Sequence, residues 1–183
     1  MLFPSLETNR LRLIEITEAN ASEIFNIFSN EDVIRYYGMD SFHTMKQASL
    51  IIDLFSKRFQ NKQGIRWGIV KKDTNEFIGT IGLNNLQVAS KKAEIGYDLL
   101  PDFWRRGYVY EAIKEVITYS FQILEIYRIG AVTYPENEAS SNLLYKAGFQ
   151  KEGELRGYLF QNGQSHDAFI FSILKTDWNK NNT

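Results

Sequence analysis

A short turn, Trp104–Tyr108 (WRRGY), lies between a predicted strand and a predicted helix and carries groups suited to holding an anion. The first N–H groups of a helix lack partners within the helix, and the helix dipole adds about half a positive charge there. Arg105 and Arg106 add to that charge, so we expect the turn to bind the pyrophosphate of a nucleotide-like cofactor. The alternative is an ordinary helix start with a solvated arginine pair. The turn matches neither the dinucleotide fingerprint nor a nucleoside-triphosphate loop, since their further glycines and Lys-Ser/Thr are missing.

Two carboxylates precede this turn on one face of the predicted strand at 92–100. Glu94, Gly96 and Asp98 alternate along it with the apolar residues Ala93, Ile95, Tyr97 and Leu99. A carboxylate on this face could accept a proton from a substrate group. Glu94 is the first candidate for this role and Asp98 the second. A solvent-facing Glu94 paired with Lys91 or Lys92 is the alternative.

Other reactive groups are scarce. The chain has no Cys, which excludes a cysteine nucleophile, a disulfide framework and thiolate metal sites. Its two histidines, His43 and His166, are far apart and lack ligand-spaced neighbours, so we expect no metal site. His166 could lie near an acceptor cleft, although a histidine at the start of a strand is most often structural.

Length and composition describe a soluble globular protein. The 183 residues suffice for one domain, and we expect a single domain over 1–183, as a monomer or homodimer. The formal net charge of −1 does not indicate a nucleic-acid-binding surface. No apolar run approaches the roughly 20 residues that span a bilayer, and the first residues do not resemble a signal peptide. We therefore expect a cytoplasmic protein with no membrane or nucleic-acid partner.

The elements that position these residues follow from hydrophobic periodicity. Strand patterns occur at 8–17, 66–71, 76–86, 92–100, 127–133, 149–160 and 165–175, and Asn162-Gly163 is a strong hairpin signal. Helical patterns occur at 20–30, 31–37, 44–59, 109–124 and 137–146, with Thr44 and Gln47 forming a capping box. The polar tail DWNKNNT is expected to fray. This order predicts an α+β domain with a mixed sheet, in which the helix at 109–124 joins two parallel strands.

Five segments together resemble the GNAT superfamily of N-acetyltransferases, more closely its RimJ/RimL-like branch of ribosomal-protein N-terminal acetyltransferases. They are EIGYDLLPDFWRRGYVYEA, TNRLRLIEIT, FIGTIGL, NEASSNLLYKAGFQKEGELR and FIFSILKTDW, which cover nearly the whole chain. The resemblance implies a GNAT-like, mostly antiparallel sheet of about seven strands, splayed between the strands at 92–100 and 128–133. It also implies acetyl-CoA as the co-substrate, with no metal.

The turn departs from the family pattern at two positions. Arg105 stands where this branch usually has glycine, and Val109 stands where the family has a small residue. A Val109 side chain facing the pyrophosphate could crowd it, whereas one turned into the helix–sheet contact would not.

The resemblance assigns the cofactor contacts residue by residue. Backbone N–H groups of Arg106, Gly107, Tyr108, Val109 and Tyr110 would hold the pyrophosphate, and Arg105 would add positive charge beside it. Main-chain groups of Tyr97, Leu99 and Leu100 would pair with the pantetheine like an added strand. Asn137 and Ser140 would bind the pantetheine end or order that region.

Direct transfer of an acetyl group to a primary amine also needs a base, an acid and an acceptor site. Glu94, Asp98 or a water chain would take the amine proton, and Tyr145 is the candidate acid for the thiolate, with helix packing as its alternative role. Tyr36, Met39 and Trp67 are candidates for the acceptor side. The acceptor would be a protein N-terminal amine or a small amine such as a polyamine, amino sugar or amino acid; a non-catalytic acyl-CoA-binding module is a further possibility.

Overall fold

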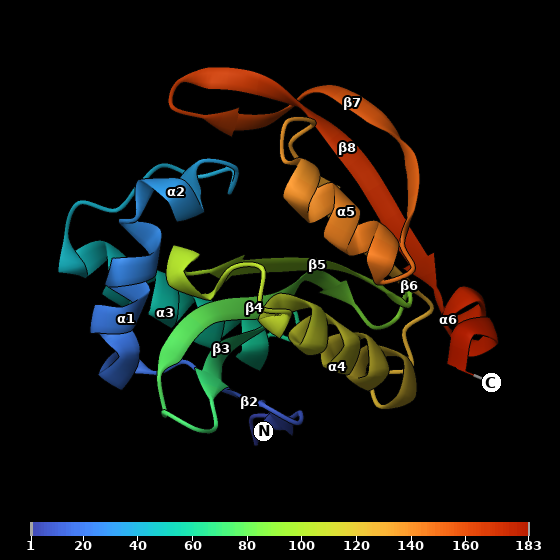
Figure 1. Cartoon of the computed structure of the whole chain (residues 1–183), viewed down its shortest axis with the longest axis horizontal. Coiled ribbons are helices and arrows are strands. Elements are labelled where there is room, and N and C mark those ends of the chain that lie inside the picture. The colour runs from blue at the N-terminus through green and yellow to red at the C-terminus, as the bar shows by residue number, and fades with distance from the viewer. Residues whose placement is uncertain (1, 183) are drawn as a thin grey trace.

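Eight strands form one continuous sheet in the computed structural model, which describes residues 2–182 and side chains up to residue 180 (Figure 1). The spatial order is β1-β2-β3-β4-β5-β6-β8-β7, and only β5 and β6 run parallel. The prediction of a mixed, mostly antiparallel sheet is confirmed. It has eight strands because a short first strand pairs with the second. The bounds are β1 (Leu6–Glu7), β2 (Leu11–Glu15), β3 (Ile65–Lys71), β4 (Phe77–Gln87), β5 (Lys92–Leu99), β6 (Arg128–Thr133), β7 (Gln150–Gln161) and β8 (Gln164–Leu174).

The helices begin and end at the residue types that predicted them. Thr44 and Gln47 form the capping box that starts α3, and Asn137 accepts a hydrogen bond from the backbone N–H of Ser140 at the start of α5. Asn162 and Gly163 take left-handed conformations in the β7–β8 turn. The bounds are η1 (Glu18–Asn20), α1 (Ala21–Phe28), α2 (Glu31–Ile34), α3 (Met45–Gln60), η2 (Pro101–Phe103), α4 (Tyr108–Gln122), α5 (Glu138–Lys146) and α6 (Lys175–Asn182).

The C-terminal tail is a helix, so the prediction of a frayed end is wrong for its described part. Helix α6 continues directly from β8. Trp178 packs on the main core, with its ring 5.7 Å from that of Phe121 on α4. The burial of this one large aromatic ring outweighs the low helix propensity of the polar residues around it.

Two apolar clusters cover the two faces of the sheet. On one face, α4 packs with Ala112, Ile113 and Val116 onto the central strands, and α4 lies in front of them in Figure 1. On the other side, α1, α2 and α3 form a second cluster that includes Phe77 and Leu100. Side chains of β5 therefore alternate between the α4 core, where Ala93 and Ile95 lie, and the opposite face.

The parallel strands β5 and β6 are paired only over their first few residues and then diverge. Their pairing comprises Lys92 with Arg128, Ala93 with Ile129, and Glu94 with Gly130, and stops there. The rest of β5, from Ile95 to Leu99, has pairing partners on β4 but none on β6. The predicted splay is confirmed, and it leaves one edge of β5 without a neighbouring strand in the middle of the sheet.

Candidate active site

Glu94 lies at the apex of the splay, as the last β5 residue in register with β6. Its half-buried carboxylate accepts a hydrogen bond of 3.0 Å from the side-chain amide of Asn85. The facing residue is Gly130, where an added Cβ would lie 3.4 Å from the Cγ of Glu94. The absence of a side chain at Gly130 therefore leaves space beside the carboxylate at the point where the gap opens.

Tyr145 lies near the same level of the sheet on the opposite face. Its ring packs edge-on to Phe171, 5.3 Å away, and Phe171 belongs to the core under α4. Phe171 pairs with Ala131, the residue after Gly130. The Tyr145 side chain is half exposed and stands over β8, one strand beyond the gap. Tyr145 thus lies over β8, on the face of the sheet opposite to Glu94.

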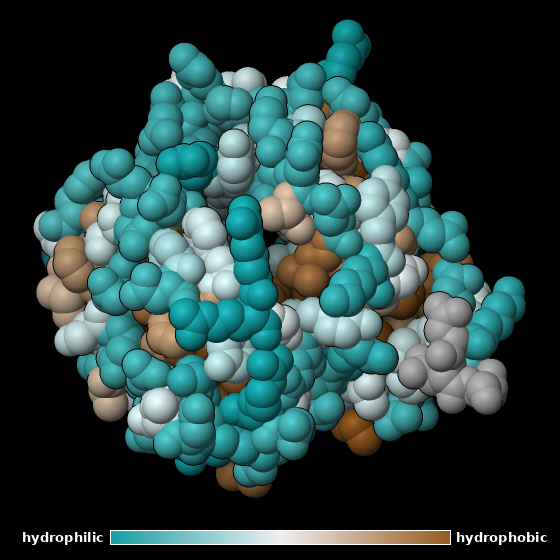
Figure 2. Space-filling view, viewed as in Figure 1, coloured by the Kyte–Doolittle hydropathy of each residue, from teal (hydrophilic) through white to brown (hydrophobic). Residues whose placement is uncertain are grey.

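A second hydroxyl pair lies where the gap widens. The Tyr97 hydroxyl on β5 and the Ser140 hydroxyl on α5 are 2.8 Å apart. Burial raises the pKa of Tyr97 more than the hydrogen bond with Ser140 lowers it, and the net pKa is about 12. The phenol therefore stays protonated at neutral pH. The structure therefore brings together two residues that the sequence assigned to the cofactor. Figure 2 shows a recess with an apolar floor near the centre of this face, where β5 passes beside α5 in Figure 1.

The turn that leads into α4 is held in an unusual backbone conformation. Arg105 has a φ of 59° and Gly107 a φ of 79°, both left-handed. The Trp104 indole donates a hydrogen bond of 2.7 Å to the carbonyl of Leu99, which fixes the turn against the end of β5. Arg105, Arg106 and Gly107 are exposed. The free N–H groups at the start of α4 and two arginines are thus presented to solvent, as a site for a pyrophosphate requires.

The departures at Arg105 and Val109 have structural explanations. Val109 packs on the α4 core, so its side chain is directed into the helix–sheet contact. The rings on either side of Val109 contact cations: the Tyr108 ring, which also packs on the core, lies under the guanidinium of Arg10, and the Tyr110 ring lies 4.6 Å from the ammonium of Lys146. Arg105 occupies a left-handed position that favours glycine, the residue that the related motif carries there.

Replacing Arg105 with glycine is expected to raise the free energy of unfolding by about 0.5–1 kcal/mol. The left-handed conformation costs an L-residue about 1–2 kcal/mol, part of which the greater freedom of glycine in the unfolded chain offsets. Arg106→Gly is the matched control, because Arg106 has no positive φ and should lose stability. Urea denaturation measures both, and a shift of the two variants in the same direction would contradict the explanation.

Asp98, the second candidate base, is committed to a buried ion pair. Its side chain is 1% exposed and lies 2.7 Å from the guanidinium of Arg66, which is 5% exposed. The backbone N–H and the hydroxyl of Thr80 also donate to it, at 2.8 and 2.5 Å. Burial raises the pKa of Asp98, and these donors oppose the rise. With both oxygens engaged and no exposed surface, Asp98 has no access to a substrate amine, which leaves Glu94 as the available carboxylate on this face.

Two glycines make room for this ion pair. Arg66, Gly82 and Gly96 are paired across β3, β4 and β5. An added Cβ on Gly82 would lie 2.6 Å from the Cδ of Arg66, so the Arg66 side chain runs over the space that the glycine leaves. Arg66 also donates hydrogen bonds to the carbonyl of Gly96, at 3.2 Å, and through Nη2 to the hydroxyl oxygen of Tyr37, at 2.5 Å. The network therefore ties β5 to the segment that follows α2.

The acceptor candidates Tyr36 and Met39 lie in that segment, which the side-chain amide of Gln161 braces. Gln161, 4% exposed at the end of β7, donates to the carbonyls of Ile34 and Met39, both at 2.8 Å. Its oxygen accepts from the Gly38 N–H and, at 2.6 Å, from the Tyr134 hydroxyl. The tip of the β7–β8 hairpin reaches toward α2 in Figure 1. All four hydrogen-bonding positions of the amide are filled, so it fixes the α2 segment to the hairpin.

Trp67 is not brought to this region. Its side chain has no exposed surface, its indole donates to the carbonyl of Pro4, and its ring contacts Tyr119 on α4. A side chain enclosed in the α4 core cannot line an acceptor cleft. Arg66 and Gln161 were missed by sequence reasoning, because an isolated Arg or Gln in a strand reads as solvent-facing. For Arg66, the available signal was the pair of glycines Gly79 and Gly82 inside the strand at 76–86, which indicates a close approach of another group.

A hollow of about 680 Å³ opens on the Glu94 face, over β5, β6, β7 and β8. Its charged lining is mixed: Glu94, Glu152 and Glu154 supply carboxylates, and Lys92 and Arg128 supply cations. Arg128 holds Glu152 by two hydrogen bonds, of 2.7 and 2.5 Å. The hollow joins the candidate base to an open, mixed-charge surface on which an acceptor could lie.

Two further features bear on function. Within residues 2–182, no group of three or more His, Asp or Glu side chains is arranged to hold a metal ion. Across the same residues, none of the helices has the length and apolar character needed to cross a bilayer.

The sequence and the fold of this chain are both similar to those of known proteins. Residues 10–150 match the model of the Acetyltransferase (GNAT) domain. The chain is 49% identical to the uncharacterized N-acetyltransferase YoaA of Bacillus subtilis (strain 168), over 95% of this chain and 98% of YoaA. It is 32% identical to the ribosomal protein uS5-alanine N-acetyltransferase of Escherichia coli (strain K12), over 64% of this chain and 62% of that protein. A solved spermidine N-acetyltransferase from Vibrio cholerae, in complex with CoA and spermine, shares the fold with a TM-score of 0.83 at 22% identity, covering 94% of this chain and 99% of that chain.

Proposed function

The chain belongs to the GNAT acetyltransferase family, and from that premise we propose that it transfers an acetyl group directly from acetyl-CoA to the N-terminal amine of a protein. Acetyl transfer from acetyl-CoA is the activity of the family. The direct route and the N-terminal acceptor are our proposal. The observation that carries it is the end of β5–β6 pairing at Glu94 and Gly130, because it leaves a free strand edge beside a carboxylate.

The residues around the gap fit acetyl-CoA. The edge of β5 from Tyr97 to Leu100, which has no neighbouring strand on the β6 side, would pair with the pantetheine amides as a further strand would, although the Leu99 carbonyl also accepts from the Trp104 indole and the Leu100 N–H donates to Ile78 on β4. The N–H groups of residues 106–110 would hold the pyrophosphate, and Val109 does not crowd it because it packs on the core. Asn137, the N-cap of α5, would order the loop beside the pantetheine end. When bound, acetyl-CoA supplies the acetyl thioester, whose carbonyl carbon accepts the amine.

Glu94 would act as the base. An amine becomes a nucleophile only after losing its proton, and the half-buried Glu94 lies where the acceptor would meet the gap. A backbone N–H near Tyr97 would polarise the thioester carbonyl. Since the chain has no Cys, no acetyl-cysteine relay is available, and transfer within a complex of both substrates is the direct route.

Tyr145 remains our candidate for protonating the leaving thiolate, and the Tyr97–Ser140 pair is a second source of a proton. Tyr145→Phe is expected to lower kcat by roughly 10–100-fold, within or below the usual range for a general acid, with CoA affinity nearly unchanged. Tyr97→Phe provides the matched comparison, because it removes a hydroxyl that lies at the gap itself. Steady-state kinetics with calorimetric CoA binding measure both variants. An unchanged kcat in Tyr145→Phe together with a lowered kcat in Tyr97→Phe would show that the proton for the thiolate comes from Tyr97 and not from Tyr145.

The mixed charge of the hollow beside Glu94 favours a peptide over a polyamine. Three carboxylates and two cations line it, so it does not form the strongly acidic cleft that a polyamine with several positive charges would require. A small amine is the second candidate, because a spermidine N-acetyltransferase shares the fold.

One assay separates these possibilities. The protein is incubated with acetyl-CoA and either N-terminally free peptides, spermidine or an amino sugar, and released CoA is measured with a thiol reagent. The absence of Cys in the chain means that the reagent reports CoA alone. We expect peptides to give the highest kcat/KM. Turnover with spermidine alone would identify a small-amine enzyme, and tight CoA binding without turnover would identify an acyl-CoA-binding module.

A further inference from the structure

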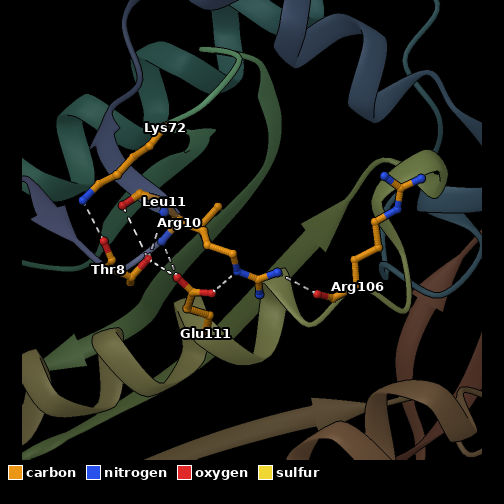
Figure 3. Close-up of polar contacts among 6 residues, drawn as sticks. All are labelled: Thr8, Arg10, Leu11, Lys72, Arg106 and Glu111. Atoms are coloured by element: carbon orange, nitrogen blue, oxygen red, sulfur yellow. Dashed lines mark hydrogen bonds and ion pairs between the residues drawn. The ribbon is translucent and has the colours of Figure 1, made fainter.

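The turn between β1 and β2 is hydrogen-bonded to the first turn of α4 through one carboxylate, that of Glu111. Glu111 accepts hydrogen bonds from the Thr8 hydroxyl at 2.5 Å, from the Arg10 backbone N–H at 2.8 Å and from the Arg10 Nε at 2.7 Å (Figure 3). Its side chain is 19% exposed, whereas that of Arg10 is 42% exposed. Residues about a hundred positions apart in the chain are thus joined by three charge-assisted contacts at the start of α4.

Arg10 also reaches past Glu111 to the cofactor turn itself. Its Nη1 donates a hydrogen bond of 3.1 Å to the carbonyl of Arg106 (Figure 3). Its guanidinium lies over the Tyr108 ring, 4.4 Å from the ring centre. An added Cβ on Gly107 would meet the Nη2 of Arg10 at 3.4 Å. One guanidinium therefore contacts Arg106 and Tyr108 and covers the open side of Gly107 between them.

The hydrogen bond to Arg106 fixes the direction of the next N–H group. The C=O of Arg106 and the N–H of Gly107 belong to one trans peptide unit, so they point in opposite directions. With the carbonyl held toward Arg10, the Gly107 N–H must point away from the β1–β2 turn. Rotation of this peptide unit would reverse both groups and would direct a carbonyl, rather than an N–H, toward a bound anion.

The turn has little of its own to prevent that rotation. Gly107 has no side chain, so its φ of 79° is not enforced by sterics, and the left-handed Arg105 is intrinsically unfavourable. Arg106 and Gly107 are exposed, so packing does not hold them. Among the described residues, the guanidinium of Arg10 is the group that donates a hydrogen bond to the Arg106 carbonyl.

Glu111 holds the Arg10 side chain in place through an ion pair. At this position a carboxylate without a counter-charge would repel a bound anion. Burial raises the pKa of Glu111, but hydrogen bonds from Thr8 and Arg10 outweigh this effect and lower it, so the carboxylate stays ionised. Its charge is matched by Arg10 at 2.7 Å. The pair therefore presents no net negative charge to the turn while fixing the guanidinium in one orientation.

We propose that Arg10, held by Glu111, is a positioning residue for the cofactor pyrophosphate, because it orients the peptide unit between Arg106 and Gly107. This proposal rests on the proposed function of the turn. It adds that affinity for the cofactor depends on the β1–β2 turn, which lies outside the cofactor motif.

The test compares two acetyl donors in wild type and Arg10→Lys. Lysine keeps the charge but cannot contact Glu111 and the Arg106 carbonyl together through a planar fork. We expect Arg10→Lys to raise the KM for acetyl-CoA, and the Kd for CoA, about tenfold, as for the loss of one oriented hydrogen bond. The KM for S-acetylpantetheine, which has no pyrophosphate, should stay within about twofold, and kcat should not change. Glu111→Gln should show the same pattern more weakly.

Lys72→Gln is the matched control. The Lys72 ammonium holds the same turn through the Thr8 carbonyl, at 2.7 Å, and Glu7, at 2.9 Å, but no contact joins it to α4 in the described residues. It should lower the melting temperature without altering the KM for either donor. Equal KM values for acetyl-CoA in wild type and Arg10→Lys, or equal losses toward both donors, would overturn the proposal. A wild type that neither binds CoA nor releases it from acetyl-CoA would instead overturn the proposed function.

Discussion

Replacing Glu94 with glutamine is expected to lower kcat by a factor of about 10²–10⁴, the usual contribution of a general base. The amide keeps the size of the side chain and its contact with Asn85 but cannot accept a proton. The KM for acetyl-CoA should change little, because Glu94 lies at the apex of the gap and not at the pyrophosphate turn. Stopped-flow release of CoA at a fixed peptide concentration measures the effect.

Glu152→Gln is the control for this experiment. Glu152 lines the same hollow, but hydrogen bonds from Arg128 and then from Ser172 lower its pKa to about 2, which makes it a poor base at neutral pH. Its replacement should reduce kcat less than about tenfold. A kcat for Glu94→Gln within threefold of wild type, or a larger loss in Glu152→Gln, would indicate a water chain or a different base.

Replacing Asp98 with alanine is expected to lower the free energy of unfolding by about 3–5 kcal/mol, because it leaves the buried guanidinium of Arg66 without a counter-charge. That loss is a large part of the stability of a typical domain. Guanidinium chloride denaturation, followed by the fluorescence of the buried Trp67, measures it.

The double variant Arg66→Met with Asp98→Leu tests the cause. Removing both charges leaves no unpaired ion in the interior, so the double variant should be more stable than Asp98→Ala by several kcal/mol. If the single and double variants were equally destabilised, the cost would come from lost packing under α3 and not from the unpaired charge.

Local patterns predicted the elements well wherever the determining residues are neighbours. The Thr44–Gln47 box, the Asn162-Gly163 turn and the long apolar stripe of α4 each involve contacts within a few residues, and each is observed as expected. The α6 helix was missed because its anchor is a contact between Trp178 and Phe121. Periodicity within the tail carries no information about such a distant partner.

The distinction between the two carboxylates of β5 also lay beyond the sequence. Glu94 and Asp98 have the same chemistry and lie on the same face, four residues apart. What separates them is Arg66, which reaches Asp98 over the space left by Gly82 and does not reach Glu94. A strand pattern indicates the face of a residue, whereas its availability depends on which side chain from another strand lies beside it.

The Gln161 brace has a consequence for how the protein folds and opens. It joins Ile34, Gly38 and Met39 to a residue more than 120 positions later, so forming it requires the closure of a long loop. Contacts of such long sequence separation form late and slow folding. Since one amide supplies these hydrogen bonds, the α2 segment and the hairpin tip should open together, and amide hydrogen exchange at Gly38 should follow that of β7 and β8. A contact expected to form late in folding would then also hold the segment that carries the acceptor candidates Tyr36 and Met39.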